Sequence, residues 1–154
     1  MRRCLLLSSL LLLAVVALHA EGWLLPLSER QQYSVAIEAR GAELTGVCIV
    51  KTDAEGSRGA IVNEFGFHAL DFTLSADRRK VKLLNVMPVM NRWYVRKVVR
   101  KDLKYLFSAT ESPQAKGPRK VESEADGSVT LENTRYKLKY SFKPINREEN
   151  ETAE

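Results

Sequence analysis

Cysteine and histidine are scarce in this chain of 154 residues, which holds two of each. Cys4 and His19 lie in an apolar N-terminal segment, so the rest of the chain has only Cys48 and His68. A single cysteine excludes an internal disulfide. A zinc site would require several such ligands close together. The sequence therefore predicts neither a metal nor another cofactor.

Recognisable catalytic motifs are also absent, because the chain has neither a glycine-rich phosphate loop nor a nucleophile elbow. We expect Cys48 to be a small buried strand residue and His68 a structural histidine on the apolar side of its strand. No catalytic residue is predicted, and the chain is expected not to be an enzyme. One alternative stays open, since Glu64 and Asp71 lie seven residues apart and could form the acid–base pair of a small hydrolase.

Long apolar runs are confined to the N-terminus. Arg2 and Arg3 precede an apolar stretch from Leu5 to Leu18, and a small residue, Ala20, follows it. This stretch of about 14 residues is shorter than the roughly 20 that span a bilayer as a helix. A short apolar stretch behind a positive start is typical of a secretory signal peptide. We therefore predict that residues 1–20 direct export to the periplasm or outer membrane, with a retained anchor as the alternative.

The remaining chain has a modest charge and the length of one domain. Without residues 1–20 it keeps 22 of the 24 basic residues and all 19 acids, a net charge of about +3. This charge does not indicate nucleic acid, and export argues against it. We predict a single β-rich domain at residues 21–143. Residues 144–154 are polar and acidic and are expected to be a disordered tail.

Short segments with strand character follow one another at roughly ten-residue intervals, which predicts an antiparallel meander. In the first of them, Tyr33, Val35, Ile37 and Ala39 share one side, and a turn is expected at Gly41-Ala42. In 63–67, Gly66 is expected to permit a bend while Phe65 and Phe67 fill the core. The predicted strands are Tyr33–Arg40, Leu44–Lys51, Gly59–Glu64, Phe67–Leu74 and Lys80–Val86.

The period then changes to that of a helix, predicted at Arg92–Phe107. One face is apolar, with Val95, Val98, Val99, Leu103 and Leu106. Another face carries cations four residues apart, here called the basic ridge: Arg92, Arg96, Arg100 and Lys104. Two interpretations remain open for the basic ridge. It is either a solvated face partly neutralised by nearby acids, or a contact surface for anionic lipid head groups or an acidic partner.

Strand patterns return after this helix, at Arg119–Ser123, Val129–Glu132 and Arg135–Phe142. The last of these alternates, so that Tyr136, Leu138, Tyr140 and Phe142 are expected to face the core. The fold class predicted from these patterns is mainly β (α+β). It is a curved antiparallel sheet, or an incomplete β-barrel, packed on one amphipathic helix.

Four stretches carry a resemblance to a known group: Gly-Val-Cys-Ile-Val-Lys, Asn-Glu-Phe-Gly-Phe, Ala-Leu-Asp-Phe and Arg-Lys-Asp-Leu-Lys-Tyr-Leu-Phe. Over about residues 33–142 the chain resembles uncharacterised exported bacterial proteins. These in turn look like the outer-membrane lipoprotein carrier and receptor proteins (the LolA/LolB-like fold). The resemblance implies an incomplete barrel whose concave apolar face binds acyl chains of a lipid or lipoprotein. Alternation then offers these lining candidates: Val35, Ile37, Val47, Ile49, Phe72, Tyr136, Leu138 and Tyr140.

The expected function is that of an exported, non-enzymatic envelope protein that binds a lipid, a lipoprotein or another apolar ligand. The alternative is a structural or interaction module of the cell envelope, with a solid core and the basic ridge as its contact surface. The candidate partners are the acyl chains of a lipid or lipoprotein and an anionic membrane surface, and nucleic acid is not expected.

Overall fold

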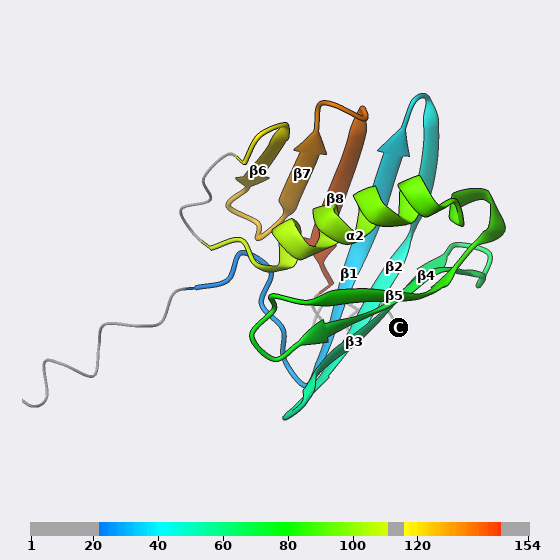
Figure 1. Cartoon of the computed structure of the whole chain (residues 1–154). Coiled ribbons are helices and arrows are strands. Elements are labelled where there is room, and N and C mark those ends of the chain that lie inside the picture. Colours follow the sequence, from blue (N-terminus) through cyan, green and yellow to red (C-terminus); the bar gives the residue numbers. More distant parts are fainter. Residues whose placement is uncertain (1–21, 111–115, 146–154) are drawn as a thin grey trace, which may run out of the picture.

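The computed structural model describes residues 22–110 and 116–145, which form one eight-stranded antiparallel sheet and one long helix (Figure 1). The strand order across the sheet is β5-β4-β3-β2-β1-β8-β7-β6. The prediction of a mainly β fold is therefore confirmed. The strands are β1 (Arg30–Ala39), β2 (Ala42–Asp53), β3 (Gly56–Asn63), β4 (His68–Ser75), β5 (Val81–Val86), β6 (Arg119–Ser123), β7 (Val129–Asn133) and β8 (Leu138–Pro144).

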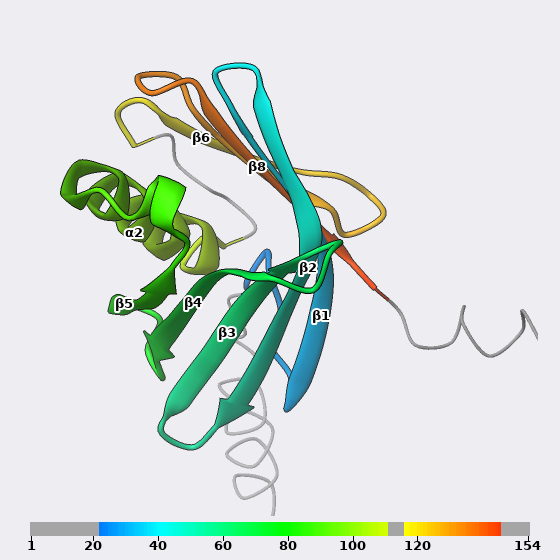
Figure 2. The same ribbon diagram turned by 90° about the vertical axis from the view of Figure 1, so that its right-hand side faces the viewer.

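The sheet curves around the helix α2 (Trp93–Phe107), which lies across its concave side (Figure 2). Strands β1 to β5 form the expected meander, and β8 then pairs with the free side of β1. The sheet does not close, because β5 and β6 remain its two edges. A short 3₁₀ helix, η1 (Pro88–Met90), connects β5 to α2. No helix within the described residues is long and apolar enough to cross a membrane.

Two predicted boundaries shift by one residue. The β1–β2 turn consists of Arg40 and Gly41, with φ of 48° and 86°, instead of Gly41-Ala42. Positive φ at both central residues is the geometry of the two-residue turn that matches strand twist. At the other end, Pro144 still pairs with Tyr33 in the sheet, so the domain extends past residue 143. The predicted signal peptide and residues 146–154 of the predicted tail lie outside the described residues.

The core lies between the sheet and the second half of α2. The buried apolar residues of α2 are Val99, Leu103, Leu106 and Phe107, while the preceding turns are only partly covered. The Phe107 ring packs against Phe72 at 5.4 Å and Phe142 at 5.8 Å between centroids. The C-terminal half of α2 is therefore fixed on the sheet by apolar contact.

A buried polar network holds the same half of α2. Asp102 is 1% exposed and accepts hydrogen bonds from Arg119 Nε at 2.7 Å, Asn133 Nδ2 at 2.9 Å and Tyr140 Oη at 3.1 Å. These donors belong to three neighbouring strands, β6, β7 and β8. Burial, together with the Asp102 charge, raises the pKa of Tyr140 well above its ordinary value, so its hydroxyl stays a donor.

Arg78 connects the carboxyl end of this helix to the N-terminal lead-in. Its buried guanidinium donates to the carbonyl of Leu25 at 2.8 Å and to that of Phe107 at 3.3 Å, and it stacks on the Trp23 ring. A cation at the carboxyl end of a helix is favoured by the helix dipole. Burial lowers the pKa of Arg78, but its contacts with carbonyl oxygens keep the charge solvated by the protein.

Candidate ligand-binding cavity

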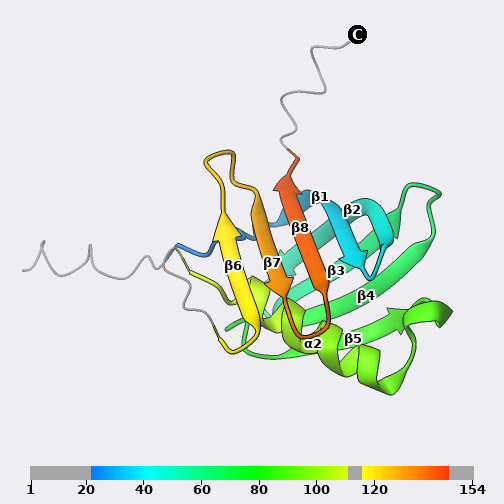
Figure 3. The same ribbon diagram turned by 90° about the horizontal axis from the view of Figure 1, so that it is seen from above.

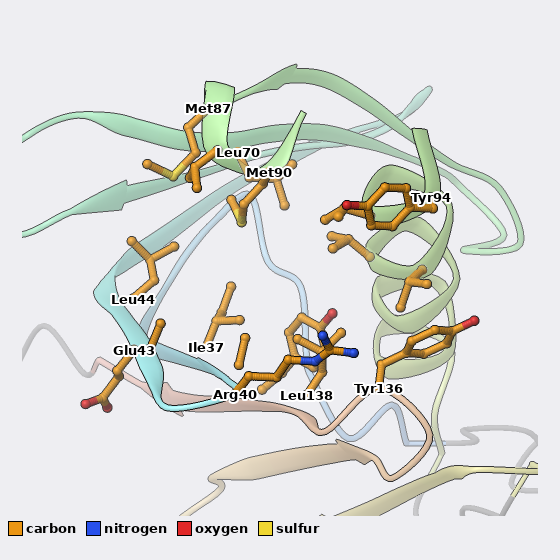
Figure 4. Close-up of a pocket in the computed structure, with 17 residues that line it drawn as sticks. Ile37, Arg40, Glu43, Leu44, Leu70, Met87, Met90, Tyr94, Tyr136 and Leu138 are labelled. Atoms are coloured by element: carbon orange, nitrogen blue, oxygen red, sulfur yellow. The ribbon is translucent and has the colours of Figure 1, made fainter. Parts of the chain in front are cut away.

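An apolar cavity of about 600 Å³ lies between the first half of α2 and the concave face of the sheet (Figure 4). This volume is in the range of sites that hold small organic ligands, roughly 300–1,000 Å³. Apolar and aromatic residues form the wall, with two charged residues, Arg40 and Glu43. The other lining residues are Ile37, Ala39, Ala42, Leu44, Leu70, Met87, Val89, Met90, Tyr94, Val95, Val98, Val99, Tyr136, Leu138 and Tyr140.

The cavity exists because the two halves of α2 are held differently, the first half at the β5 edge through Arg96 and the second half by the core. Its second half sits on the core, whereas Tyr94, Val95 and Val98 in its first half face the cavity. The connection through η1 adds Met87 and Met90 to the wall. Methionine is flexible and polarizable, so it adapts to apolar groups of different shape.

The β1–β2 and β7–β8 turns lie at the same end of the sheet (Figure 3), and both turns and η1 contribute lining residues to the cavity. Several lining residues there are exposed: Val89 at 75%, Tyr94 at 55% and Tyr136 at 40%. Single exposed apolar side chains are normal, but a contiguous group of them marks a binding surface.

Four of the eight predicted lining residues border this cavity: Ile37, Tyr136, Leu138 and Tyr140. Strand pairing brings them together, since β1 lies beside β8 with Ile37 opposite Tyr140. Tyr136, however, reaches the cavity from the β7–β8 turn. The predicted strand Arg135–Phe142 begins only at Leu138. The position of Tyr136 at the rim of the cavity is therefore determined by the β7–β8 turn and not by strand alternation.

The other four predicted lining residues lie elsewhere. Val35 and Phe72 are buried in the solid core. Val47 and Ile49 lie on the opposite, convex face, because Tyr33 on the core side pairs with Cys48 and neighbouring residues point to opposite faces. The prediction that Val47 and Ile49 line a concave cavity is therefore wrong. The continuous apolar run of β2 concealed which of its residues face inward.

The lining residues that the sequence did not predict include Leu44, Leu70, Met87, Met90 and Tyr94. Leu44 was detectable in principle, since it pairs with Ile37 across the β1–β2 hairpin and shares its face. Met87, Met90 and Tyr94 lie in the β5–α2 connection and the first turn of α2. Strand alternation does not apply there, so the sequence did not show that these side chains face the cavity.

The basic ridge is on the solvent side of α2, with one exception. Arg92, Arg100 and Lys104 are exposed and form no ion pair with any residue in 22–110 or 116–145. Arg96 is partly covered, and its guanidinium donates to Asn91 Oδ1 at 3.1 Å and to the Leu83 carbonyl at 3.0 Å. Three cations of the basic ridge thus stay available, while Arg96 holds α2 to β5.

The open alternative of an acid–base pair gains no geometric support. The Asp71 carboxylate is hydrogen-bonded to His68 Nδ1 at 2.9 Å and to Asn85 Nδ2 at 2.7 Å. Glu64 lies in the exposed β3–β4 turn. Burial opposes ionisation of Asp71, but the hydrogen bonds from Asn85 and His68 outweigh it and lower its pKa. Among the described residues, no three His, Cys, Asp or Glu side chains are grouped to hold a metal ion.

His68 is exposed, which corrects its predicted place on the apolar side of the strand. The pairing of β3 with β4 shifts between Ile61 and Val62, so that Ala69 is an extra residue. Such a bulge reverses the alternation, and Ala69 and Leu70 are both buried while His68 turns outward.

Phe65 and Phe67 are likewise exposed, at 75% and 69%, where core positions were expected. The Asn63 side chain accepts hydrogen bonds from the backbone N–H of Phe65 and Phe67 at 3.1 and 2.8 Å. Gly66 completes this turn with a φ of 82°. The turn therefore holds both rings outward.

Cys48 is fully buried, as expected for a small strand residue. Burial raises the pKa of its thiol to about 12. The thiolate, which is the reactive form, is therefore scarce near neutral pH.

Comparison with known proteins assigns this chain to no family. A scan against protein-family models found no match, and a search of curated proteins found none. The cavity and the exposed cations are the features from which a function has to be argued.

Proposed function

We propose that this chain is an exported, non-enzymatic envelope protein that binds a lipid acyl chain, a lipoprotein or another apolar ligand in the cavity under α2. The observation that carries the proposal is the apolar cavity of about 600 Å³, open at one end of the sheet. Transfer of an apolar ligand from water into such a cavity is favourable, roughly in proportion to the apolar surface that it buries. A curved open sheet with one covering helix also agrees with the carrier-like architecture that the resemblance implies.

Binding of a neutral fluorescent apolar probe, N-phenyl-1-naphthylamine, tests this function. We expect saturable binding of one probe per chain. Leu44→Trp, which places a large ring in the cavity, should weaken binding by about tenfold or more. The measurement is probe fluorescence titrated with protein.

Val47→Trp is the matched control, because Val47 is on the same strand as Leu44 but on the convex face. It should leave probe binding unchanged. Equal effects of the two substitutions, or no saturable binding by the unmodified protein, would reject the cavity as a binding site. The alternative of a solid-core interaction module would then be favoured.

A second function, contact with an anionic membrane surface, is supported by the cations of the basic ridge. Each Lys or Arg near such a surface contributes about 1 kcal/mol. Trp93, 76% exposed at the start of α2, adds an aromatic side chain of the kind found at membrane interfaces. We propose that α2 faces the membrane during ligand loading or delivery.

Replacing Arg100 and Lys104 together by Gln should weaken binding to phosphatidylglycerol vesicles by about 2 kcal/mol at low salt. Binding to neutral phosphatidylcholine vesicles should not change. Lys51→Gln with Arg58→Gln is the control, since this exposed cross-strand pair lies on the convex face and removes the same charge. Vesicle co-sedimentation gives the affinities, and an equal loss in both double variants would show that only net charge matters.

A further inference from the structure

Arg40 is the one cation among the residues that line the cavity. It is a central residue of the two-residue β1–β2 turn, and its neighbours Ala39 and Ala42 are paired across the hairpin. Both flanking strands are also paired with further strands of the sheet. The position from which Arg40 extends is therefore fixed relative to the cavity.

The guanidinium of Arg40 extends across the cavity toward the side of Leu138 and Tyr136, whereas the carboxylate of Glu43 points away from it (Figure 4). Within the described part of the chain Arg40 has no ion-pair partner. A nearby acid on the preceding strand β1, Glu38, pairs with Lys139 instead, at 3.7 Å. Arg40 thus places an unpaired positive charge at a largely apolar cavity, whose other charged lining residue, Glu43, turns its carboxylate away.

Apolar walls of low dielectric strengthen the field of a charge at the mouth of a cleft. A guanidinium presents paired N–H donors that match the two oxygens of a carboxylate or phosphate. Hydrocarbon suits the wall beyond Arg40, where Leu44, Leu70 and Met87 lie. The Arg40 guanidinium therefore favours an anionic head group, and the apolar wall favours the hydrocarbon chain of the same amphiphile.

Building on the proposed function, we infer that the natural ligand carries an anionic head group, which Arg40 binds while the hydrocarbon chain fills the cavity. The head group is a carboxylate or a phosphate, and both offer the oxygens that a guanidinium recognises. A neutral or cationic amphiphile of the same chain length lacks this contact.

Displacement of bound N-phenyl-1-naphthylamine by four dodecyl compounds tests the inference. They are dodecanoate, dodecyl phosphate, dodecanol and dodecyltrimethylammonium, compared at pH 8 and low salt. At least one of the two anions should displace the probe at a concentration about five- to tenfold lower than dodecanol. The stronger of the two identifies carboxylate or phosphate as the head group. The preference should diminish as salt is added, because the contact is partly exposed.

Arg40→Gln should make the anions and dodecanol displace the probe at equal concentrations, each corrected for the probe affinity measured with that variant. Arg40→Lys, which retains the charge, should keep most of the preference. Arg79→Gln is the matched control, since this exposed arginine lies in the β4–β5 turn at the opposite end of the sheet, and it should behave as the unmodified protein.

Equal displacement by anions and dodecanol in the unmodified protein would overturn the inference while leaving the apolar site intact. A preference for anions that survives Arg40→Gln would overturn the role of Arg40. Failure of the probe and of all four compounds to bind would instead reject the proposed function itself. The comparison within the unmodified protein decides the charge preference even if Arg40→Gln does not fold.

Discussion

Replacing Asp102 by alanine is expected to lower the free energy of unfolding by about 3–5 kcal/mol, because it breaks a buried charge network and leaves its donors unpaired. Asn133 and Tyr140 are almost fully buried and would each lose their bond to the Asp102 carboxylate. The Arg119 side chain, 17% exposed, would lose its only ion-pair partner among the described residues. Urea denaturation followed by circular dichroism measures the change.

Asp126→Ala is the control for this prediction. Asp126 is an exposed acid whose ion pair with Lys143 spans 3.5 Å at the surface. Exposed pairs contribute little to stability, and the hydrogen bond that Asp126 accepts from the Ser128 N–H at 2.9 Å is at the surface, so this variant should lose about 1 kcal/mol at most. Asp102→Asn keeps the shape of the side chain without its charge and should fall between the two. A loss for Asp102→Ala no larger than that for Asp126→Ala would contradict the network described for the core.

The second large effect is expected for Phe107→Ala, which should cost about 3–5 kcal/mol through lost burial and the cavity that remains. Phe107 is fully buried and lies between the rings of Phe72 and Phe142. It also anchors the end of α2 that holds the helix on the sheet. Thermal and urea unfolding give the loss of stability.

Trp93→Ala on the same helix is the matched control for Phe107→Ala. The Trp93 side chain is larger but 76% exposed, so its removal should change stability by about 0.5 kcal/mol at most. Similar losses for the two variants would mean that both ends of α2 are packed equally. That result would contradict the physical origin of the cavity, which depends on a helix whose second half is packed in the core while its first turns are not.

Strand positions were largely predictable from the sequence, because alternation and turn residues are local signals. The first strand shows this best, since Tyr33, Val35 and Ile37 occupy the buried face that their spacing indicates. The helix was equally clear and begins one residue after its predicted start. The second strand could not be oriented in this way, because the four consecutive apolar residues from Val47 to Val50 do not show which of them face the core.

The candidate site was predictable only in part. The candidate set included Ile37, Leu138 and Tyr140, which line the cavity by simple alternation. It also included Val47 and Ile49, whose outward orientation follows from the pairing of Tyr33 with Cys48. Phe65 and Phe67 were assigned to the core by their hydrophobicity, yet a turn stabilised by Asn63 exposes them.

By itself the sequence determined the kind of each element, the predominance of β-structure and the chemistry of the helix faces, since these depend on neighbours three or four residues away at most. Only the tertiary structure decided the strand order, the outward turn of His68 and the presence of the cavity. These depend on contacts between distant residues: β1 pairs with β8, Ala69 forms a bulge, and Asp102 holds the second half of α2 while residues of the first half face the cavity. The cavity arises from that unequal attachment, which no local pattern encodes.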